Sequence, residues 1–241
     1  MMTPIHKVDY RNESGSAFFY ILLGVVLFGT LVFTVSRGMR GQSTNALTQY
    51  QAELAADDIL HYAQTMARAV DRVRRNGCSE SDISFHHTGW GHTQYEHSPA
   101  TADQCKIFHP NGGNLSFSAL DDYHEKNLDH AGRVIFVGRS AINNIGTTCT
   151  NASCTELYLF IRMFHAENLC RKMNELLEIS PTLPISGGIY GGPRFNGTFS
   201  YGNTLTTSAF NGQHSGCYED NSETYTDGTP YYDFYYVLLE R

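Results

Sequence analysis

The pattern of apolar and polar residues separates one long apolar run near the start of the chain from a mixed region that follows. No charged side chain occurs between Glu13 and Arg37, and the nineteen residues from Ala17 to Val35 are almost all apolar. As a helix that rises about 1.5 Å per residue, this run is about 28 Å long, close to the ~30 Å hydrocarbon core of a bilayer. We therefore expect a transmembrane helix over residues 16–36.

A secretory signal peptide is the main alternative for this run. Signal peptides have apolar cores of about 7–15 residues that end at a small-residue cleavage site. Here the run is longer, and Ser36-Arg37-Gly38 follows it. Basic residues flank it equally, with Lys7 and Arg11 before it and Arg37 and Arg40 after it, so the positive-inside rule does not choose an orientation.

An amphipathic pattern follows the apolar run. From Gln42 to Asn76 apolar residues recur every three or four positions, which predicts a helix with one apolar face. This face consists of Leu47, Tyr50, Leu54, Ile59, Tyr62, Met66, Val70 and Val73. Arginines in the last turn, followed by Asn76-Gly77, are typical of a helix C-terminus. The sequence thus predicts an amphipathic helical region over residues 37–77, after the apolar helix.

The remaining residues, 78–241, predict a head domain with both strands and helix. The expected elements are strands at Ile83–His86, Leu115–Ser118, Arg133–Ser140, Glu156–Phe164 and Tyr231–Glu240, a helix at His165–Ile179, and a glycine-rich hairpin and loop region at Gly187–Asn203. Packing the amphipathic helix on an antiparallel sheet is the economical way to bury its apolar face. The expected fold class is therefore α+β, with a long N-terminal helix against an antiparallel sheet.

Six cysteines all follow the apolar run, at Cys78, Cys105, Cys149, Cys154, Cys170 and Cys217. An even number on one side of a membrane span fits three disulfides in an oxidising compartment, and the spacings do not suit zinc. Six cysteines allow fifteen pairings, among which the sequence does not select. We take Cys149–Cys154, Cys78–Cys105 and Cys170–Cys217 as a working set.

Composition and motifs exclude several function classes. The formal net charge is −7 with no basic block, which argues against a nucleic-acid partner. The chain has no G-x-S-x-G, H-E-x-x-H or P-loop motif, so we expect no enzyme activity. Fifteen tyrosines and 22 glycines could instead form adaptable loops that contact proteins or sugars.

Two groups of residues could in principle hold a metal ion. Hard oxygen ligands gather before the last strand, at Asp220, Asn221, Glu223 and Asp227, and they suit Ca²⁺ by charge and type, although the EF-hand order is missing. Four histidines also lie close together, at His86, His87, His92 and His97. Glycines interrupt this second group, which favours a solvated loop over a metal site.

The start of the chain resembles the type IV pilins and the type II secretion pseudopilins. A short polar leader, residues 1–15, ends at Gly15, and SAFFYILLGVVLF follows directly. The resemblance implies that a prepilin peptidase cleaves after Gly15 and methylates Ser16. It also implies that the apolar helix leaves the bilayer to join a filament, with other pilin-like subunits and an inner-membrane assembly platform as partners. The implied location is the bacterial inner membrane, crossed once, with the head in the periplasm or on an extracellular filament; the family also includes members with Ca²⁺ in a C-terminal loop.

Two positions depart from the family pattern. Most members have glutamate at the fifth mature position, which is Tyr20 here, and Phe or Met at the first, which is Ser16 here. Lack of the glutamate resembles the minor pseudopilins at a filament tip, so we expect a minor structural subunit. The alternative is a single-pass membrane-anchored binding module for a protein or glycan, which does not polymerise.

Overall fold

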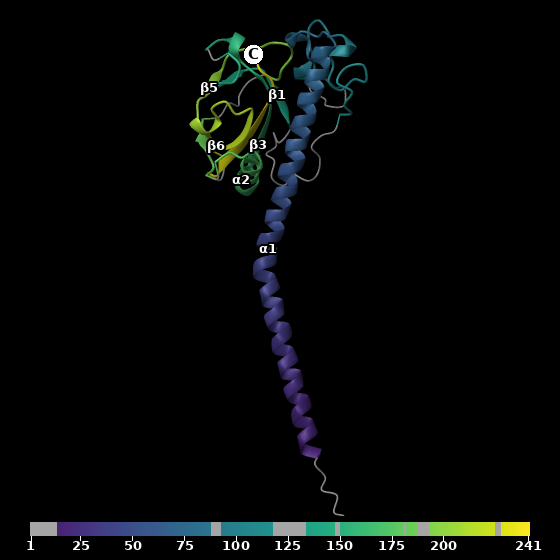
Figure 1. Ribbon diagram of the computed structural model, residues 1–241, viewed down its shortest axis with the longest axis vertical. Coiled ribbons are helices and arrows are strands. Elements are labelled where there is room, and N and C mark those ends of the chain that lie inside the picture. The colour runs from purple at the N-terminus through teal and green to yellow at the C-terminus, as the bar shows by residue number, and fades with distance from the viewer. Residues whose placement is uncertain are drawn as a thin grey trace, which may run out of the picture. The chain divides into compact units, whose positions relative to one another are not determined.

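The computed structural model describes residues 14–87, 93–117, 134–147, 150–180, 182–187, 193–224 and 228–241; within 14–48 it describes side chains only at 19–28 and 30. The chain forms two compact units, Met1–Gln49 and Tyr50–Arg241. Helix α1, Ser14–Arg75, begins in the first unit and ends in the second (Figure 1). The predicted apolar and amphipathic helices therefore both belong to this element.

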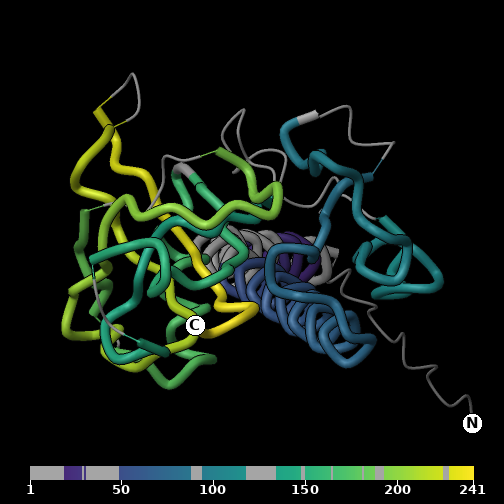
Figure 2. Tube along the Cα trace, turned by 90° about the horizontal axis from the view of Figure 1, so that it is seen from above, coloured from purple at the N-terminus to yellow at the C-terminus, as the bar shows by residue number. Residues whose placement is uncertain are grey.

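In the second unit α1 buries Ile59, Met66, Val70 and Val73 of the face that the sequence predicted, whereas Tyr50 and Leu54 of that face are 59% and 38% exposed. The buried residues are Ala55, Ala56, Ile59, Leu60, Ala63, Met66, Ala69, Val70 and Val73. The four alanines have small side chains, so the helix backbone can approach its neighbours closely. Figure 2 shows the sheet on one side of this helix segment. The helix ends as predicted: Gly77 takes φ +89°, and the N–H of Cys78 donates to the carbonyl of Val73.

A five-stranded sheet forms the centre of the second unit. Its strands, in spatial order, are β1 (Ile135–Val137), β3 (Leu157–Phe164), β7 (Pro230–Leu239), β6 (Ser215–Thr224) and β4 (Ile185–Ser186). The first four are antiparallel, and β4 pairs parallel to β6. A separate parallel pair joins β2 (Ser140–Ile142) to β5 (Asn203–Leu205), and helix α2 spans Glu167–Leu176. Short 3-10 helices occur at Glu80–Asp82, Thr93–Tyr95, Asp103–Cys105, Ala152–Cys154 and Ser208–Phe210.

The sheet separates two hydrophobic clusters, and the alternation of residues along β3 shows this directly. Leu157, Leu159, Ile161 and Met163 point into a large cluster with α1 and α2, while Tyr158 and Phe160 point into a smaller cluster with β2 and β5. Because successive side chains of a strand point to opposite faces, a strand that is apolar on both faces must lie inside the fold. The fold is therefore α+β, with a long helix packed on a mostly antiparallel sheet.

Two of the disulfides in the working set are confirmed, Cys78–Cys105 and Cys170–Cys217. Cys154 is also disulfide-bonded, and Cys149 lies outside the described residues. Disulfides persist in oxidising compartments, so they indicate that the second unit is extracytoplasmic.

Helix α2 is held on strand β6 by a covalent bond and by one side chain. Next to the Cys170–Cys217 disulfide, the buried amide of Asn174 accepts from the N–H of Cys217 at 2.9 Å and donates to its carbonyl at 2.7 Å. This amide takes the place of a neighbouring strand at this point of β6. It satisfies backbone groups that would otherwise be costly to bury, and it closes the sheet edge to another strand.

The strand predictions succeeded where apolar residues dominate. Strands β3 and β7 lie within one residue of the expected ranges, and helix α2 begins two residues later and ends three residues earlier than expected. The predicted strand Arg133–Ser140 is wrong as one element, because the chain leaves the sheet at Gly138 and begins β2 at Ser140. A Cβ at Gly138 would lie 2.8 Å from the ring of Phe199, so this glycine permits a close approach at the break.

Three other regions differ from the sequence-based expectations. Ile83–His86 makes only a single bridge, between Ser84 and Lys106, and 115–117 is not a strand; Ser118 lies outside the described residues. Of the predicted glycine-rich region, residues 193–202 are irregular and lie along the edge of β1, where the N–H of Phe195 donates to the carbonyl of Phe136.

Candidate functional site

The predicted processing positions lie at the beginning of α1. Gly15 and Ser16 are the second and third residues of this helix, and their side chains are outside the described set. A peptidase needs an extended backbone, and the first turn of a helix is where the backbone opens most readily. Cleavage after Gly15 stays a prediction.

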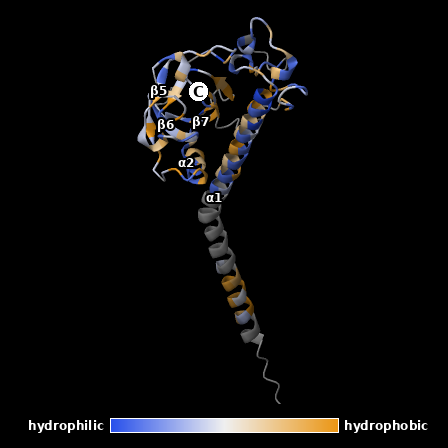
Figure 3. Cartoon of the chain, turned by 45° about the horizontal axis from the view of Figure 1, so that its top comes forward, coloured by the Kyte–Doolittle hydropathy of each residue, from blue (hydrophilic) through white to orange (hydrophobic). Residues whose placement is uncertain are grey.

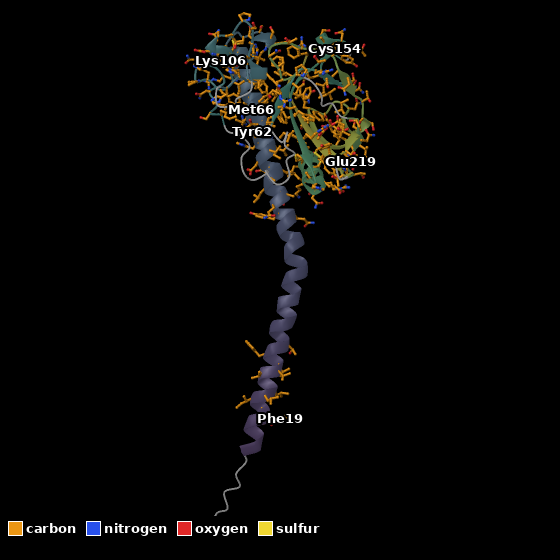
Figure 4. All side chains as sticks on the ribbon, turned by 180° about the vertical axis from the view of Figure 1, so that it is seen from behind. Phe19, Tyr62, Met66, Lys106, Cys154 and Glu219 are labelled. Carbon is orange, nitrogen blue, oxygen red and sulfur yellow. A yellow bond between two sulfur atoms is a disulfide. The ribbon has the colours of Figure 1, made fainter. Side chains whose placement is uncertain are left out.

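The apolar segment of the first unit, Phe19–Phe28, has no described neighbour that buries it. Each large side chain in it is 45–71% exposed. Figure 3 shows hydrophobic residues on this part of α1, and Figure 4 shows side chains that project to both sides of the helix. They are Phe19, Tyr20, Ile21, Leu22, Leu23, Val25, Val26, Leu27 and Phe28. A helix that is apolar all round is stable only where lipid or other protein surrounds it. This segment is therefore the candidate for membrane contact and for assembly.

Just after this segment, one polar side chain is satisfied inside the helix. The hydroxyl of Thr30 donates to the carbonyl of Leu27 at 2.9 Å, which removes its need for water. Among the described residues, no helix meets the length and hydropathy required of a membrane span.

The second unit contains a buried charge cluster centred on Arg162 of β3. Its Nε and Nη2 donate to Asp233 Oδ1 and Oδ2 at 3.0 and 2.9 Å, from the directly opposite position on β7. Nη2 also donates to Asp220 Oδ2 of β6 at 2.5 Å, and Nη1 donates to Glu223. Arg162 is 4% exposed and both aspartates are fully buried, whereas Glu223 is 57% exposed. The guanidinium also lies 4.6 Å from the ring centre of Tyr231.

The electrostatics of this cluster explain why it joins three strands. Burial raises the pKa of Asp233, and the guanidinium of Arg162 opposes that rise. One cation faces two buried carboxylates, so removing the cation would leave both without compensation. We assign the cluster to holding β3, β7 and β6 in register.

The predicted Ca²⁺ ligands belong partly to this cluster. Asp220 and Glu223 bind the guanidinium of Arg162, and Asp220 Oδ1 also accepts from the N–H of Ser222 at 2.8 Å. Asn221 is exposed, and Asp227 lies outside the described residues. Two of the four predicted Ca²⁺ ligands, Asp220 and Glu223, therefore bind the guanidinium of Arg162. Over the described ranges no group of three His, Cys, Asp or Glu side chains is placed to hold a metal ion.

The histidines also have separate partners. His86 Nε2 lies 3.6 Å from Glu96 Oε1, and His87 stacks on Phe117 with ring centres 4.6 Å apart. His97 packs against Phe195, and burial lowers its pKa. His92 lies outside the described residues. The described histidines thus belong to different contacts and do not share a centre.

A second buried carboxyl, Glu156, lies between β2 and β3. Its Oε2 accepts from the N–H of Ile142 at 2.9 Å, while Oε1 has no hydrogen-bond partner among the described residues. Burial raises the pKa of Glu156 to about 7; backbone N–H groups and the Arg241 guanidinium oppose the rise, and Glu240 adds to it.

This raised pKa predicts how stability depends on pH. Because the folded pKa exceeds the ordinary value of 4.5, the folded state binds this proton more tightly than the unfolded chain does. The contribution of Glu156 is therefore most favourable below pH 4.5 and is lost as the pH rises to about 7. We expect Glu156→Gln to be more stable than the parent by about 3 kcal/mol at pH 8 and equal to it at pH 4, measured by urea unfolding. A difference that does not change with pH would contradict this assignment.

An open polar depression lies near the end of α1. It has a volume of about 500 Å³ and is lined by Asn76, Asp103, Gln104 and Asn111. The Cys78–Cys105 disulfide joins the two segments that form it, and a hydrogen bond from Lys106 lowers the pKa of Asp103. Amide and carboxylate groups of this kind can bind ligands rich in hydroxyl groups.

Comparisons with known proteins give no family assignment. No protein-family model, curated protein or solved structure matches the chain.

Sequence reasoning missed the Arg162 cluster, although two signals for it were present. Arg162 lies inside the apolar strand, between Ile161 and Met163, and Asp233 interrupts the aromatic run from Tyr231 to Tyr236. A charge at the centre of a buried strand requires a partner of opposite sign, so the two strands could have been paired through these residues.

Proposed function

We propose that this protein is a minor pilin-like or pseudopilin-like structural subunit of a type IV filament or a type II secretion apparatus. In this proposal a prepilin peptidase cleaves it after Gly15, and the apolar helix anchors it in the bacterial inner membrane until assembly. Other pilin-like subunits and an inner-membrane assembly platform then surround that helix, while the disulfide-bonded head faces the periplasm or lies on the filament.

The observation that carries this proposal is the exposed apolar segment Phe19–Phe28. It begins four residues after the predicted cleavage position, and the described part of the chain offers nothing to cover it. Burying apolar side chains yields about 1.5–3 kcal/mol each, so a segment of this size needs lipid or neighbouring helices around it. A disulfide-bonded α+β head that follows such a helix fits a subunit assembled outside the cytoplasm.

Tyr20 supports a minor role within such an assembly. In the resembling family, the glutamate at this position neutralises the N-terminal amine of a neighbouring subunit in an apolar environment. The side chain of Tyr20 is 67% exposed and ends in a phenol instead of a carboxylate, so it does not provide that ion pair. A subunit without this pairing group suits a tip position.

Substitution at Gly15 tests the proposal. We expect Gly15→Leu to accumulate as the full-length chain in the membrane and to be absent from assembled material, because a branched side chain blocks the backbone approach that the peptidase needs. The measurement is an immunoblot of membrane and filament fractions. Gly24→Ala is the matched control, since a Cβ at Gly24 meets no atom within 4 Å. Normal cleavage and assembly of Gly15→Leu would refute the proposal.

A membrane-anchored binding module is the second candidate, and the polar depression at Asn76, Asp103, Gln104 and Asn111 favours it. Such a module would keep the residues before Ser16 and would remain in the membrane. In that case Gly15→Leu would leave its distribution unchanged, which separates the two candidates.

A further inference from the structure

Four polar side chains from two segments line the depression near the end of α1. Asn76 follows the last residue of α1, Asp103 and Gln104 begin the 3-10 helix Asp103–Cys105, and Asn111 lies in the turn after it. All four residues are exposed. The side-chain amide of Asn76 donates to the carbonyl of Asn111 at 3.4 Å, which joins the two sides of the depression.

The turn that carries Asn111 is fixed by close backbone packing. A Cβ at Gly112 would lie 2.1 Å from the carbonyl oxygen of Lys106, so this position requires glycine. A Cβ at Gly113 would lie 2.4 Å from the carbonyl oxygen of Ile107, and the N–H of Gly113 donates to the carbonyl of Lys106 at 3.0 Å. A site that is already ordered loses little conformational entropy when a ligand binds.

Charges of both signs lie together at the depression. The Nζ of Lys106 donates to Asp103 Oδ1 at 2.6 Å, and Asp103 Oδ2 lies 3.6 Å from His109 Nε2. An anionic ligand would be repelled by the carboxylate, and a cationic ligand would be repelled by the ammonium group. The carboxylate oxygens keep further lone pairs that can accept from a hydroxyl group. The depression therefore suits an uncharged ligand.

Two side-chain amides of the depression have unused hydrogen-bonding groups. In the described part of the chain, no hydrogen bond is found for the side-chain amide of Gln104 or Asn111. Each of these amides offers two donors and one carbonyl acceptor, and the carboxylate of Asp103 adds further acceptors. A hydroxyl group both donates and accepts, so adjacent hydroxyls of a sugar ring can pair with an amide and a carboxylate at once.

We infer that the depression binds an uncharged saccharide through Asp103, Gln104 and Asn111. The lining favours a saccharide over a protein partner, because protein interfaces have an apolar centre and no apolar side chain lines the depression within the described residues. A few hydrogen bonds in an open site give weak binding, so we expect a Kd of about 1 mM. This site goes beyond the structural role proposed above and rests on neither candidate function, since it lies wholly in the second unit.

Saturation-transfer difference NMR of the full chain tests saccharide binding. The chain is kept in micelles of a polyoxyethylene detergent, because detergents with sugar head groups would compete for the site. The uncharged probes are maltotriose, mannotriose and chitotriose, and the charged probes are triglucosamine and trigalacturonate. We expect at least one uncharged probe to bind with a Kd of about 1 mM, and both charged probes to bind at least about fivefold more weakly than that one.

A double variant, Gln104→Ala with Asn111→Ala, locates the site. We expect it to bind the same probe at least about tenfold more weakly than the parent, because the hydrogen bonds of two amides are lost. The matched control, Gln51→Ala with Asn168→Ala, removes the same two side chains from exposed positions on α1 and α2 and is expected to bind like the parent. Near-ultraviolet circular dichroism of each variant separates loss of binding from loss of folding.

Three results would overturn the inference. They are a Kd above about 20 mM for every uncharged probe, equally tight binding of the charged probes, and unchanged binding by the folded Gln104→Ala, Asn111→Ala variant. The first result would leave the depression as a contact for a protein partner. Processing after Gly15 is measured separately on membrane and filament fractions, so failure of saccharide binding leaves the proposed function unaffected.

Discussion

Replacement of Arg162 by methionine is expected to destabilise the second unit by about 3–5 kcal/mol. Methionine fills a similar volume but leaves Asp220 and Asp233 buried without a cation, and both aspartates are fully buried. Each must then stay ionised at a high desolvation cost or take up a proton. The largest loss is therefore expected at neutral pH, with partial recovery on acidification as the carboxyls become neutral.

Urea unfolding of the full chain in detergent micelles, followed by the near-ultraviolet circular dichroism of the tyrosines, measures this loss. Arg162→Lys is the matched control and is expected to lose less, because it keeps the charge but cannot form the paired bonds to Asp233. A triple variant with methionine at 162 and leucine at 220 and 233 is expected to regain most of the stability, since no buried charge remains. An Arg162→Met variant within 1 kcal/mol of the parent would contradict the role given to this cluster.

Removal of the Cys170–Cys217 disulfide is expected to cost about 4 kcal/mol. The two cysteines are 47 residues apart, so their link removes much of the freedom of the unfolded chain. Both sulfur atoms are buried where α2 meets β6, and alanine replaces them without adding a polar group.

The Cys170→Ala, Cys217→Ala double variant is compared with the parent by the same urea unfolding. The Cys78→Ala, Cys105→Ala variant is the matched control: its shorter loop of 27 residues predicts a loss smaller by only a few tenths of a kcal/mol. Equal stability of the parent and the Cys170→Ala, Cys217→Ala variant would show that the bond does not constrain the unfolded chain.

Periodicity was sufficient to predict the elements that bury an apolar face. The α1 segment in the second unit, strand β3 and strand β7 all carry repeating apolar residues whose spacing matches their structure. Strand β6 was missed because Ser215–Thr224 contains Gly216, Glu219 and Asp220, which are residue types that strands usually avoid. What makes it a strand is tertiary: the pairing with β7, the amide of Asn174, and an arginine from β3 that neutralises Asp220.

The candidate site was predictable only where it depends on local sequence. The apolar segment near Phe19 is evident from composition alone, because the hydropathy of a segment does not depend on which residues it contacts in the fold. The supposed cation ligands Asp220 and Glu223 could not be assigned from sequence, because the same carboxylates suit a metal ion and an arginine equally well. The structure brings Arg162 to them from a strand about sixty residues earlier, and no local pattern reports a contact of that separation.

The central claim is that the chain is processed as a pilin-like subunit, and the most direct test is the intact mass and N-terminal sequence of the protein isolated from its native membranes. The account predicts a chain that begins at N-methylated Ser16, with disulfide-bonded cysteines. A chain that retains the residues before Ser16 would contradict the account and would identify a permanently anchored extracytoplasmic protein.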